Sequence, residues 1–343
     1  MARARLRRPR HSRVVLALNC AEHARHFEAC EKLPVEIRHA RFDVPWQEVA
    51  ARRGGGGPAV PQVVSNELIA ALREAEVLFA FAPPRGLTVL APSLEWVETP
   101  ATGFDQLNGT GVLENDVIVT TVGDLFAGVV AEHAFALLFA LTRRLAELGA
   151  AQREAAWRPL PVRELEGATI AIVGLGNIGR AVARAAKAFG MRVLGSRRKP
   201  GRAVAGVDRL YPARKLKDML AQADVVVVSV AGTPETAGMI GAAELAAMKR
   251  GALLVNVARG SVVDEPALVV ALREGHLGGA GLDVFADEPL PATSPLWKLP
   301  NTVITPHVAI TIPSRMPRAI AHFAANLTRY CKGEPLKDVV RRR

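Results

Sequence analysis

An apolar segment, a glycine-rich turn and an alanine-rich helical segment follow one another in the middle of the chain. Gly174, Gly176 and Gly179 form the pattern GxGxxG between apolar residues 169–173 and a helical pattern over residues 177–189. The first amides and the dipole of such a helix favour a pyrophosphate at the turn. The three glycines would permit a tight turn, close approach of phosphates and close helix–strand packing. The pattern predicts a dinucleotide-binding site; the alternative is a tight turn without a ligand.

Basic residues occupy the position at which a dinucleotide site distinguishes NAD(H) from NADP(H). In NAD-preferring sites an Asp or Glu about 20 residues beyond the glycines accepts hydrogen bonds from the adenosine ribose. Here Arg197 occupies that place, between Ser196 and Arg198. An arginine removes the ribose acceptor and offers a planar donor fork to a 2′-phosphate. The sequence therefore favours NADP(H), with NAD(H) as the alternative, unless the basic run is only a solvated strand end.

Length and charge limit the classes of protein to which the chain can belong. Its 343 residues suffice for two domains, each with its own core. No apolar run approaches the roughly 18 residues of a membrane-spanning helix, so no membrane partner is expected. The net charge of +11 sits largely in the tails, and aromatic residues, 5% of the chain, do not interleave with basic ones. Nucleic-acid binding is therefore not expected.

The cysteines and the N-terminal segment favour a cytoplasmic protein. Cys20, Cys30 and Cys331 are odd in number and lack metal-ligand spacing. This pattern argues against a disulfide framework and a metal site, and for a reducing compartment. The first residues are rich in arginine, like a transit peptide. Because the same compositional bias runs through the whole chain, we interpret residues 1–12 as a disordered basic tail.

Short β-branched runs alternate with helical patterns, which is typical of a parallel sheet with helical crossovers. The first part of the chain has strand patterns at 13–19, 76–81 and 94–98, a helical pattern at 66–74, and a glycine–proline loop at 54–61. Apolar residues at helical spacing predict one long helix over 123–146, which could mark a domain junction. Almost wholly apolar strands follow at 169–173, 192–195, 224–230, 253–257 and 279–285.

Strands this apolar are usually covered on both faces, as in a doubly wound sheet. The last helix, about 314–331, lies beyond this series, and we expect it to pack on the first domain. The predicted fold class is α/β with two doubly wound parallel-sheet domains and a cleft between them. Residues 126–309 would form a Rossmann cofactor domain, and residues 13–125 with 310–343 a flavodoxin-like substrate domain.

Three further segments, 255–264, 281–290 and 303–307, contain Arg259, Glu288 and His307. Together with the glycine motif they closely resemble the D-2-hydroxyacid dehydrogenase family. Four more segments look like that family in the same order: 130–133, 165–167, 233–236 and 333–336. The resemblance runs from about residue 79 to 340, and its branch for NADPH-dependent glyoxylate/hydroxypyruvate reduction is the most similar.

The resemblance implies that Arg259, Glu288 and His307 are catalytic, and elementary chemistry accounts for each. Reduction of a 2-keto acid needs a hydride on carbon and a proton on oxygen. An imidazolium is a suitable proton donor near neutral pH. Glu288 would orient His307 and keep it protonated, while Arg259 would bind the substrate carboxylate or carbonyl. Asp283 and Asp287 compete with Glu288, but the family's paired acid directly precedes proline, which selects Glu288.

The resemblance also implies binding residues. The cofactor set consists of Gly174, Gly176, Asn177, Ile178, Gly179, Ser196, Arg197, Arg198, Thr233, Val257, Ala258 and Asp283. Thr102 and Gly103 resemble the loop whose amides bind the substrate carboxylate, although an ordinary turn is the alternative. Glu132 and His133 lie within an apolar helical segment, and for both we expect packing or hydrogen bonding between the helix and its domain. Trp157 could reach a partner subunit's active site, as in some relatives, or simply fill an interface.

The resulting expectation is NADPH-dependent reduction of a small 2-keto acid to the D-2-hydroxy acid by a homodimer. Glyoxylate and hydroxypyruvate are the leading substrates, because Pro295, Leu296 and Trp297 resemble the same reductase branch. A D-3-phosphoglycerate dehydrogenase or another NAD-dependent member of the family is the alternative. Formate dehydrogenases carry an amide where Glu288 stands, which excludes them. A dinucleotide-sensing transcriptional corepressor is the alternative from another class.

Overall fold

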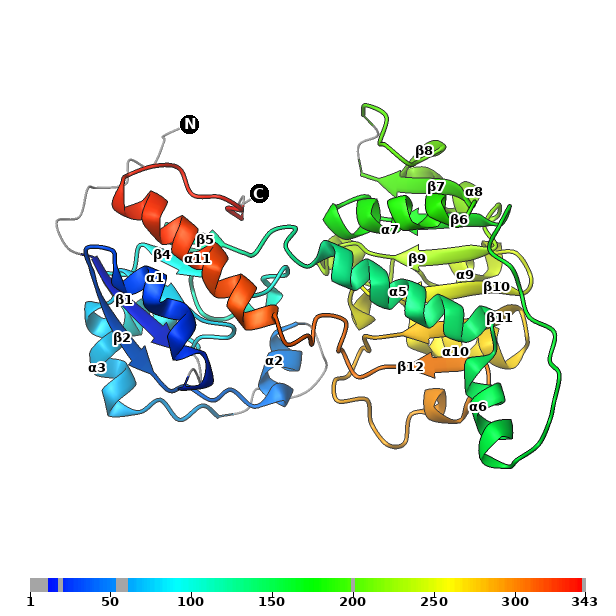
Figure 1. The fold of residues 1–343 in the computed structure, drawn as a ribbon, viewed down its shortest axis with the longest axis horizontal. Coiled ribbons are helices and arrows are strands. Elements are labelled where there is room, and N and C mark those ends of the chain that lie inside the picture. Colours follow the sequence, from blue (N-terminus) through cyan, green and yellow to red (C-terminus); the bar gives the residue numbers. More distant parts are fainter. Residues whose placement is uncertain (1–11, 18–20, 54–60, 199–200, 341–343) are drawn as a thin grey trace. The chain divides into compact units, whose positions relative to one another are not determined.

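A computed structural model describes residues 12–17, 21–53, 61–198 and 201–340 (Figure 1). The chain divides into two compact units. Unit 1 comprises Met1–Leu125 and Thr311–Arg343, and unit 2 comprises Phe126–Ile310. Nearly all of the predicted basic tail and of the predicted glycine–proline loop lies outside the described residues.

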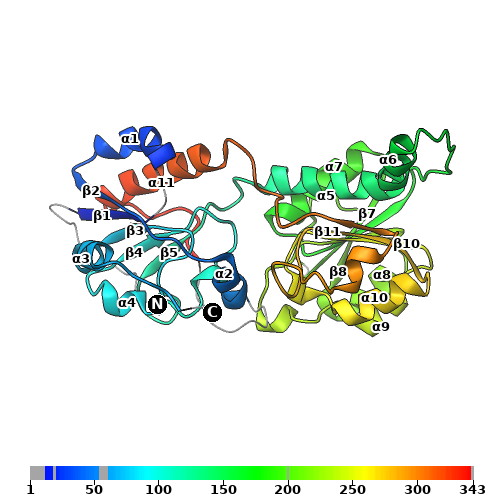
Figure 2. The same ribbon diagram turned by 90° about the horizontal axis from the view of Figure 1, so that it is seen from below.

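Unit 1 is a five-stranded parallel sheet in the order β2-β1-β3-β4-β5, a flavodoxin-like order. Its strands are β1 (Ser12–Ala17), β2 (Val35–Ala40), β3 (Val77–Phe79), β4 (Trp96–Glu98) and β5 (Ile118–Thr120). Its helices are α1 (Glu28–Glu31), α2 (Trp46–Arg52), α3 (Asn66–Glu74), α4 (Leu87–Leu90) and α11 (Arg315–Cys331), with 3-10 turns η1 (Ala21–Phe27) and η2 (Asp105–Leu107). Figure 2 shows α1 and α11 on one face of the sheet and α3 and α4 on the other.

The last helix packs on this first sheet, as the sequence predicts. Phe323 of α11 lies 4.7 Å from Phe79 and 5.3 Å from Trp96, measured between ring centroids. All three side chains are fully buried. Aromatic side chains contribute the largest buried areas per residue, so this contact fixes the returning segment against the strands of unit 1.

Unit 2 is a seven-stranded parallel sheet in the order β12-β11-β10-β9-β6-β7-β8. Its strands are β6 (Thr169–Val173), β7 (Arg192–Arg197), β8 (Arg209–Pro212), β9 (Val225–Val228), β10 (Ala252–Asn256), β11 (Leu277–Leu282) and β12 (Thr302–Ile304). Its helices are α5 (Ala127–Thr142), α6 (Leu145–Arg153), α7 (Asn177–Ala188), α8 (Leu216–Leu220), α9 (Ala242–Ala247) and α10 (Glu265–Arg273). Four 3-10 turns are η3 (Ala213–Lys215), η4 (Pro234–Thr236), η5 (Gly260–Val262) and η6 (Pro295–Lys298).

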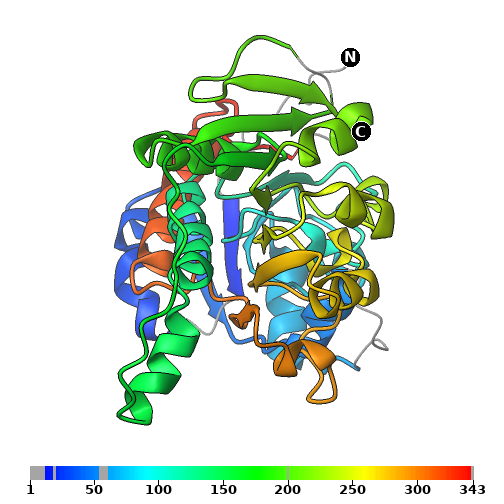
Figure 3. The same cartoon turned by 90° about the vertical axis from the view of Figure 1, so that its right-hand side faces the viewer.

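The central strands of unit 2 are apolar because helices cover both of their faces. Every residue of β6, β9 and β10 is buried. Figures 2 and 3 show α5 on one side of the sheet and α9 and α10 on the other. Counted from β6, the strand order reverses between β6 and β9, as in a Rossmann sheet with an added edge strand. The predicted α/β class with two doubly wound parallel sheets is confirmed.

The predicted long helix over 123–146 is wrong, because the structure has two helices with a break between them. Arg144 adopts a left-handed backbone (φ 54°) between α5 and α6. The carbonyl of Thr142, which a continuing helix would pair with residue 146, accepts instead from the Arg163 amide at 2.9 Å. Leu145 is consequently half exposed (52%), although its spacing matches the buried face of α5. The apolar periodicity in the sequence therefore extends beyond the end of α5.

Candidate active site

The glycine motif forms the turn between β6 and α7, and two of its glycines are required by the protein itself. Gly174 has φ +99°, and a β-carbon there would lie 2.7 Å from the Val230 side chain. A β-carbon at Gly179 would overlap the Gly174 carbonyl, which accepts a hydrogen bond from Ser229 Oγ at 2.8 Å. By contrast, a β-carbon at Gly176 would meet no protein atom within 4 Å. Internal packing thus accounts for Gly174 and Gly179 but not for Gly176, where close approach of phosphates stays a prediction.

The end of β7 lies beside this turn. Ser196 pairs in register with Val173, and its carbonyl accepts from the Gly174 amide at 3.2 Å. Arg197 is the last residue of β7; its Nη2 donates to the Arg202 carbonyl at 3.1 Å. Its Nε is buried and has no hydrogen-bond partner among the described residues. The predicted 2′-phosphate residues therefore adjoin the glycine turn, and anion binding by Arg197 stays a prediction.

The remaining predicted cofactor residues follow the carboxyl ends of neighbouring strands. Asn177 and Ile178 begin α7, Thr233 precedes η4 after β9, and Val257 and Ala258 follow β10. Because all strands of the sheet are parallel, these segments share one edge of it. Ligands of doubly wound sheets bind at this edge.

Asp283, which follows β11, is 1% exposed and uses both carboxylate oxygens within the protein. Its Oδ1 accepts from Thr305 Oγ1 at 2.7 Å and from the Val308 amide at 2.9 Å, and it lies 3.2 Å from His133 Nε2. Its Oδ2 accepts from the Ala309 amide at 3.2 Å. Burial alone would raise the pKa of Asp283, but these hydrogen bonds outweigh it and leave the pKa below its usual value.

These contacts give Asp283 and His133 a defined structural part. Together they hold the segment that follows β12, which is the segment that carries His307. For His133 this agrees with the expected hydrogen bonding from an apolar helix. A contact of Asp283 with the cofactor stays a prediction.

His307 and Glu288 form a hydrogen-bonded pair at the same edge of the sheet. His307 Nδ1 lies 2.8 Å from Glu288 Oε2, and their side chains are 18% and 9% exposed. Glu288 Oε1 accepts from the Phe285 amide at 3.1 Å, and the His307 amide donates to the Asp283 carbonyl at 2.8 Å. The backbone of His307 is left-handed (φ 53°). This uncommon conformation for a non-glycine residue is found preferentially at functional sites.

Arg259 follows β10, the neighbour of β11, and its backbone is held by a buried asparagine. Asn256, 1% exposed, donates from Nδ2 to the Arg259 carbonyl at 3.1 Å and accepts from the Ala258 amide at 3.1 Å. Nη1 of Arg259 donates to the Ala258 carbonyl at 2.7 Å, and a β-carbon at Gly232 would meet the Arg259 stem at 2.7 Å. Strands β10, β11 and β12 thus bring the three predicted catalytic residues to one edge of the sheet.

Three supporting residues were not anticipated from the sequence. Besides Asn256 they are Gly260 and Glu265. A β-carbon at Gly260 would overlap the backbone of Phe285, so only glycine lets the Arg259 loop and the Glu288 loop cross. Glu265 accepts from the Ala286 amide, and burial raises its pKa. Asn256 could have been found from the sequence, because it is a polar residue at the end of an apolar strand. Gly260 could not, because a crossing of two loops leaves no signal in the sequence.

The predicted substrate loop follows β4 in unit 1. Gln106 is fully buried, and its Nε2 donates to Thr99 Oγ1 at 2.9 Å and to the Gly103 carbonyl at 3.0 Å. Within the part of the chain that the structure describes, the amides of Thr102 and Gly103 donate to no other residue. Two fixed backbone donors of this kind suit a carboxylate.

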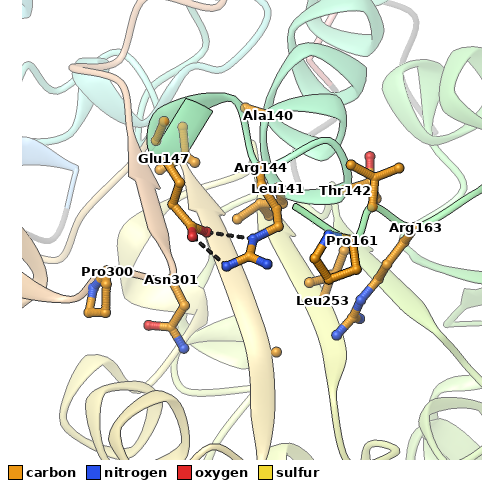
Figure 4. A pocket seen from close by; sticks show the side chains of 14 residues that line it. Ala140, Leu141, Thr142, Arg144, Glu147, Pro161, Arg163, Leu253, Pro300 and Asn301 are labelled. Carbon is orange, nitrogen blue, oxygen red and sulfur yellow. Dashed lines mark hydrogen bonds and ion pairs between the residues drawn. The ribbon is translucent and has the colours of Figure 1, made fainter. Parts of the chain in front are cut away.

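Unit 2 also contains a cavity of about 590 Å³ away from these residues (Figure 4). It is lined by Leu253 and Gly278 near the starts of β10 and β11, and by Asn301 just before β12. Arg144 and Glu147, whose side chains pair at 2.9 Å, line it as well. Because the predicted catalytic residues follow the other ends of the same strands, this cavity is not the candidate active site.

The described residues contain neither a metal-binding cluster nor a membrane-spanning helix. No group of three or more His, Cys, Asp or Glu side chains is placed to hold a metal ion. None of the helices in that part of the chain is long and apolar enough to cross a membrane.

The fold and this edge of unit 2 define an α/β oxidoreductase with a dinucleotide-binding domain. Comparison with known proteins identifies the family. The family model described as "D-isomer specific 2-hydroxyacid dehydrogenase, NAD binding domain" matches residues 135–309. The chain belongs to this family, an assignment that confirms the predicted one, and is therefore an oxidoreductase that acts on CH–OH groups.

Relatives and solved structures agree with this assignment. The chain is 40% identical over 253 residues to a glyoxylate reductase of Korarchaeum cryptofilum, covering 71% of this chain and 75% of the relative. It is 36% identical over 283 residues to a D-3-phosphoglycerate dehydrogenase of Mycobacterium leprae, covering 80% of this chain but 53% of that enzyme.

Solved structures of family members cover almost the whole chain. One is a D-isomer specific 2-hydroxyacid dehydrogenase family protein of Aeromonas salmonicida, with TM-score 0.80, 33% identity, and 97% and 99% of the two chains covered. Another is an NADPH-dependent glyoxylate/hydroxypyruvate reductase of Sinorhizobium meliloti in complex with NADP and sulfate. For this one the TM-score is 0.77 and the identity 27%, with 96% and 98% covered.

Proposed function

We propose that this protein reduces a small 2-keto acid to the D-2-hydroxy acid with NADPH, with glyoxylate and hydroxypyruvate as the leading substrates. The observation that carries the proposal is the His307–Glu288 pair, 2.8 Å between Nδ1 and Oε2, beside the Arg259 loop at the carboxyl edge of a dinucleotide-binding sheet. The glyoxylate reductase of Korarchaeum cryptofilum and the reductase of Sinorhizobium meliloti support the choice of substrates.

The chain's own residues supply binding and the proton. The nicotinamide cofactor, when bound, supplies the hydride. His307 donates a proton from Nε2 to the substrate carbonyl oxygen, while Glu288 holds Nδ1 and stabilises the imidazolium. Arg259 binds the substrate carboxylate and offsets the charge that grows on the carbonyl oxygen. The amides of Thr102 and Gly103 contribute further donors to the carboxylate.

The cofactor fits the residues that would hold it. At Gly176 the backbone offers room for phosphates, and α7 begins at Asn177 with its amides directed at the turn. Arg197, at the end of β7, carries a buried Nε without a partner in the described residues and would take the 2′-phosphate of NADP(H). Arg198 and Ser196 flank it.

One assay tests the function and the cofactor preference together. Purified protein is mixed with glyoxylate, hydroxypyruvate, pyruvate or phenylpyruvate and with NADPH or NADH, and absorbance of the reduced cofactor is followed. We expect NADPH oxidation with glyoxylate or hydroxypyruvate. If no keto acid oxidises either cofactor, the reductase proposal is wrong.

Arg197→Gln tests the cofactor site, with Arg192→Gln at the exposed start of β7 as the matched control. Loss of a charge-assisted contact should lower kcat/KM for NADPH by about 10- to 100-fold. The value for NADH should stay nearly unchanged, because NAD(H) has no 2′-phosphate. An equal loss for both cofactors, or a clear NADH preference of the wild-type protein, would contradict the role of Arg197.

Phosphoglycerate dehydrogenase activity is the second candidate, favoured by the 36% identity to the Mycobacterium leprae enzyme. Activity on 3-phosphohydroxypyruvate far above that on glyoxylate and hydroxypyruvate would replace the first proposal with this one.

We further propose a homodimer in a reducing compartment such as the cytoplasm. Trp157 is 98% exposed in the single chain, and Leu145 and Val162, close to it in the sequence, are also exposed; exposed large apolar side chains are typical of surfaces that a partner covers. The odd number of cysteines, without metal-ligand spacing, supports the reducing compartment. Light scattering coupled to size-exclusion chromatography measures the mass of the assembly.

A further inference from the structure

The predicted substrate loop, which follows β4 in unit 1, engages its carbonyl groups in hydrogen bonds within the protein. The Ala101 carbonyl accepts from the Val122 amide at 3.2 Å. The Gly103 carbonyl accepts from Gln106 Nε2 at 3.0 Å. By contrast, the amides of residues 102–104 donate to no residue that the structure describes. Hydrogen bonding in the described chain thus engages the acceptors of this loop rather than its donors.

The same hydrogen bonds set the direction of two amides in the loop. In a planar trans peptide the carbonyl group and the following N–H point in opposite directions. In the described chain neither of the peptide bonds after Ala101 and Gly103 is cis. Because the Gly103 carbonyl faces Gln106, the Phe104 N–H points away from that buried side chain. The Ala101 carbonyl, held by Val122, directs the next amide of the chain in the same way.

Gln106 itself is fixed at both its side chain and its backbone. Its Nε2 uses two hydrogens, one toward Thr99 Oγ1 at 2.9 Å and one toward the Gly103 carbonyl. Because a carbonyl can only accept, the amide nitrogen and not the amide oxygen must face Gly103. The Gln106 carbonyl accepts from Arg52 Nη1 at 3.1 Å, and Asn108 Nδ2 donates to the Arg52 carbonyl at 2.8 Å. The donor that holds the loop is therefore rigidly placed.

The oxygen of the Gln106 side chain shows that filling space does not explain a glutamine at this position. Gln106 is fully buried, and its Oε1 has no hydrogen-bond partner among the described residues. An unpaired buried acceptor opposes folding. An apolar side chain of similar length, such as methionine, would fill the same space without that cost. The two hydrogen bonds that Nε2 donates to the loop are what glutamine adds.

We propose that Gln106 is a positioning residue for the substrate carboxylate. In this arrangement the Phe104 amide donates to the carboxylate beside the amides of Thr102 and Gly103. Gln106 keeps the Phe104 N–H turned away from the core before the substrate binds, so the donors need no rearrangement. The inference rests on the proposed reductase function and deepens it at the substrate loop. It holds for every 2-keto acid, because the carboxylate is the group that these substrates share.

Gln106→Met tests the positioning role, since it keeps the length of the side chain and removes both donated hydrogen bonds. The carboxylate is bound alike in the ground state and in the transition state, so the loss should fall on KM rather than on kcat. We expect KM for glyoxylate or hydroxypyruvate to rise about 10-fold or more, and kcat to change less than about threefold. The Kd for NADPH, measured by fluorescence titration, should stay the same. An unchanged KM, or a loss that falls mainly on kcat, would overturn the proposal.

A second variant separates the donor from the shape of the side chain. Gln106→Glu has the same shape as the wild type, but a carboxylate donates no hydrogen bond. It should therefore raise KM at least as much as Gln106→Met, and it keeps the test open if Gln106→Met does not fold. A Gln106→Glu protein with the KM of the wild type would show that the donated hydrogen bonds are not needed.

Gln222→Met is the matched control. Gln222 Nε2 also donates two hydrogen bonds, to Tyr211 Oη at 2.8 Å and to the Asp218 carbonyl at 2.7 Å, but it lies in unit 2. Its substitution should leave KM for the keto acid unchanged. A rise as large as that of Gln106→Met would mean that the effect is not specific to the substrate loop, and would overturn the proposal.

Oxamate tests the carboxylate site without turnover, because it carries a carboxylate beside an amide in place of the reducible carbonyl group. Calorimetric titration of the protein with NADPH should give a Kd for oxamate that is about 10-fold or more weaker in Gln106→Met than in the wild type. A crystal structure of the wild-type complex should show a carboxylate oxygen within hydrogen-bond distance of the Phe104 nitrogen. A carboxylate bound without that contact would remove Phe104 from the site.

The two proposals fail in different ways. If no keto acid is reduced but oxamate binds and binds more weakly to Gln106→Met, the reductase function is wrong and the role of Gln106 stands. If keto acids are reduced while KM and oxamate binding are the same in Gln106→Met, the reductase function stands and the role of Gln106 is wrong. Absence of both reduction and oxamate binding would overturn both proposals.

Discussion

The two units each contain a histidine hydrogen-bonded to a glutamate, and the two pairs look alike in isolation. In unit 2, His307 Nδ1 lies 2.8 Å from Glu288, with side chains 18% and 9% exposed. In unit 1, His322 Nδ1 lies 3.0 Å from Glu98, with side chains 16% and 0% exposed. Distance and burial alone therefore do not separate the proposed catalytic pair from the other one.

His322 is engaged by carboxylates at both of its ring nitrogens. His322 Nε2 lies 3.0 Å from Asp338 Oδ2, so both ring nitrogens face carboxylates and both must donate. The hydrogen bond with Glu98 is the main cause that raises the pKa of His322, and Asp338 adds to it. A ring held in this way cannot transfer a proton without breaking an ion pair.

The His322 pair fastens the C-terminal segment instead. The Asp338 carbonyl accepts from the Thr121 amide at 3.2 Å, and the Val340 amide donates to Val119 at 2.8 Å. The segment thus adds an antiparallel bridge to β5. His307, by contrast, follows a strand at the carboxyl edge of unit 2, where Arg259 also lies. A histidine–glutamate pair becomes a candidate site through its place in the sheet.

The largest expected effect separates the two histidines by activity. His307→Gln removes the proposed proton donor, so kcat should fall by about 10²- to 10⁴-fold. His322→Gln removes a ring engaged in structure, and kcat of the folded protein should change less than about threefold, within the range of indirect effects. Steady-state kinetics with NADPH and glyoxylate or hydroxypyruvate measure both.

The affinity for NADPH serves as the control for this comparison. Fluorescence titration with NADPH should give similar Kd values for wild type and His307→Gln, because the ring acts on the substrate. A His307→Gln protein with nearly wild-type kcat would remove His307 from the mechanism. A His322→Gln protein that is fully folded yet inactive would show that the contrast between the two pairs is wrong.

Substitution of Glu98 should lower the stability of the protein, whereas substitution of Glu288 should mainly lower its activity. Glu98 is fully buried and accepts from Thr120, Asn326 and His322. Glu98→Gln places an amide among donors and removes one of the two carboxylates that pair with the histidine, which should cost about 2 to 3 kcal/mol of unfolding free energy.

Glu288→Gln should instead lower kcat by about 10- to 100-fold through misorientation of the ring, with a change in unfolding free energy below about 1 kcal/mol. Urea unfolding followed by circular dichroism measures the stabilities. Equal destabilisation by the two substitutions would erase the distinction between the pairs.

Sequence reasoning located the buried elements better than the exposed ones. The wholly apolar β6 matches its prediction residue for residue, and α3 does as well. The strand β2 was not predicted, because it lies at the edge of its sheet, where charged residues such as Glu36 and Arg38 interrupt the apolar pattern. Apolar periodicity reports burial, so an edge strand gives a weak signal.

The candidate site shows the same limit at the level of single residues. The resemblance of ordered motifs to a known family implied Arg259, Glu288 and His307, and in the structure each follows a strand of one parallel sheet. Gly260 could not be predicted, because its need for glycine comes from a backbone 25 residues further along the chain. Likewise His322 and Glu98 are 224 residues apart, and only the folded chain brings them together.

The smallest expected effect is a pH dependence confined to the His322 pair. Because the folded-state pKa of His322 is raised above the unfolded value of about 6.5, its stabilising contribution is fully present below that value and is lost as pH rises through the folded-state pKa. His322→Gln should therefore lower the unfolding free energy by about 1 to 2 kcal/mol at pH 6, and by less at pH 9.

Unfolding free energies of the variant and the wild type are measured in urea at each pH. Their difference removes the contribution of groups that titrate equally in both proteins. Asp338→Asn is the matched variant, since it removes one carboxylate from the ring and keeps the backbone atoms that bond Thr121. It should show a smaller loss with the same trend. A loss from His322→Gln that is constant between pH 6 and pH 9 would mean that the ring stabilises the C-terminal segment through packing. The charge would then no longer distinguish His322 from an ordinary buried side chain.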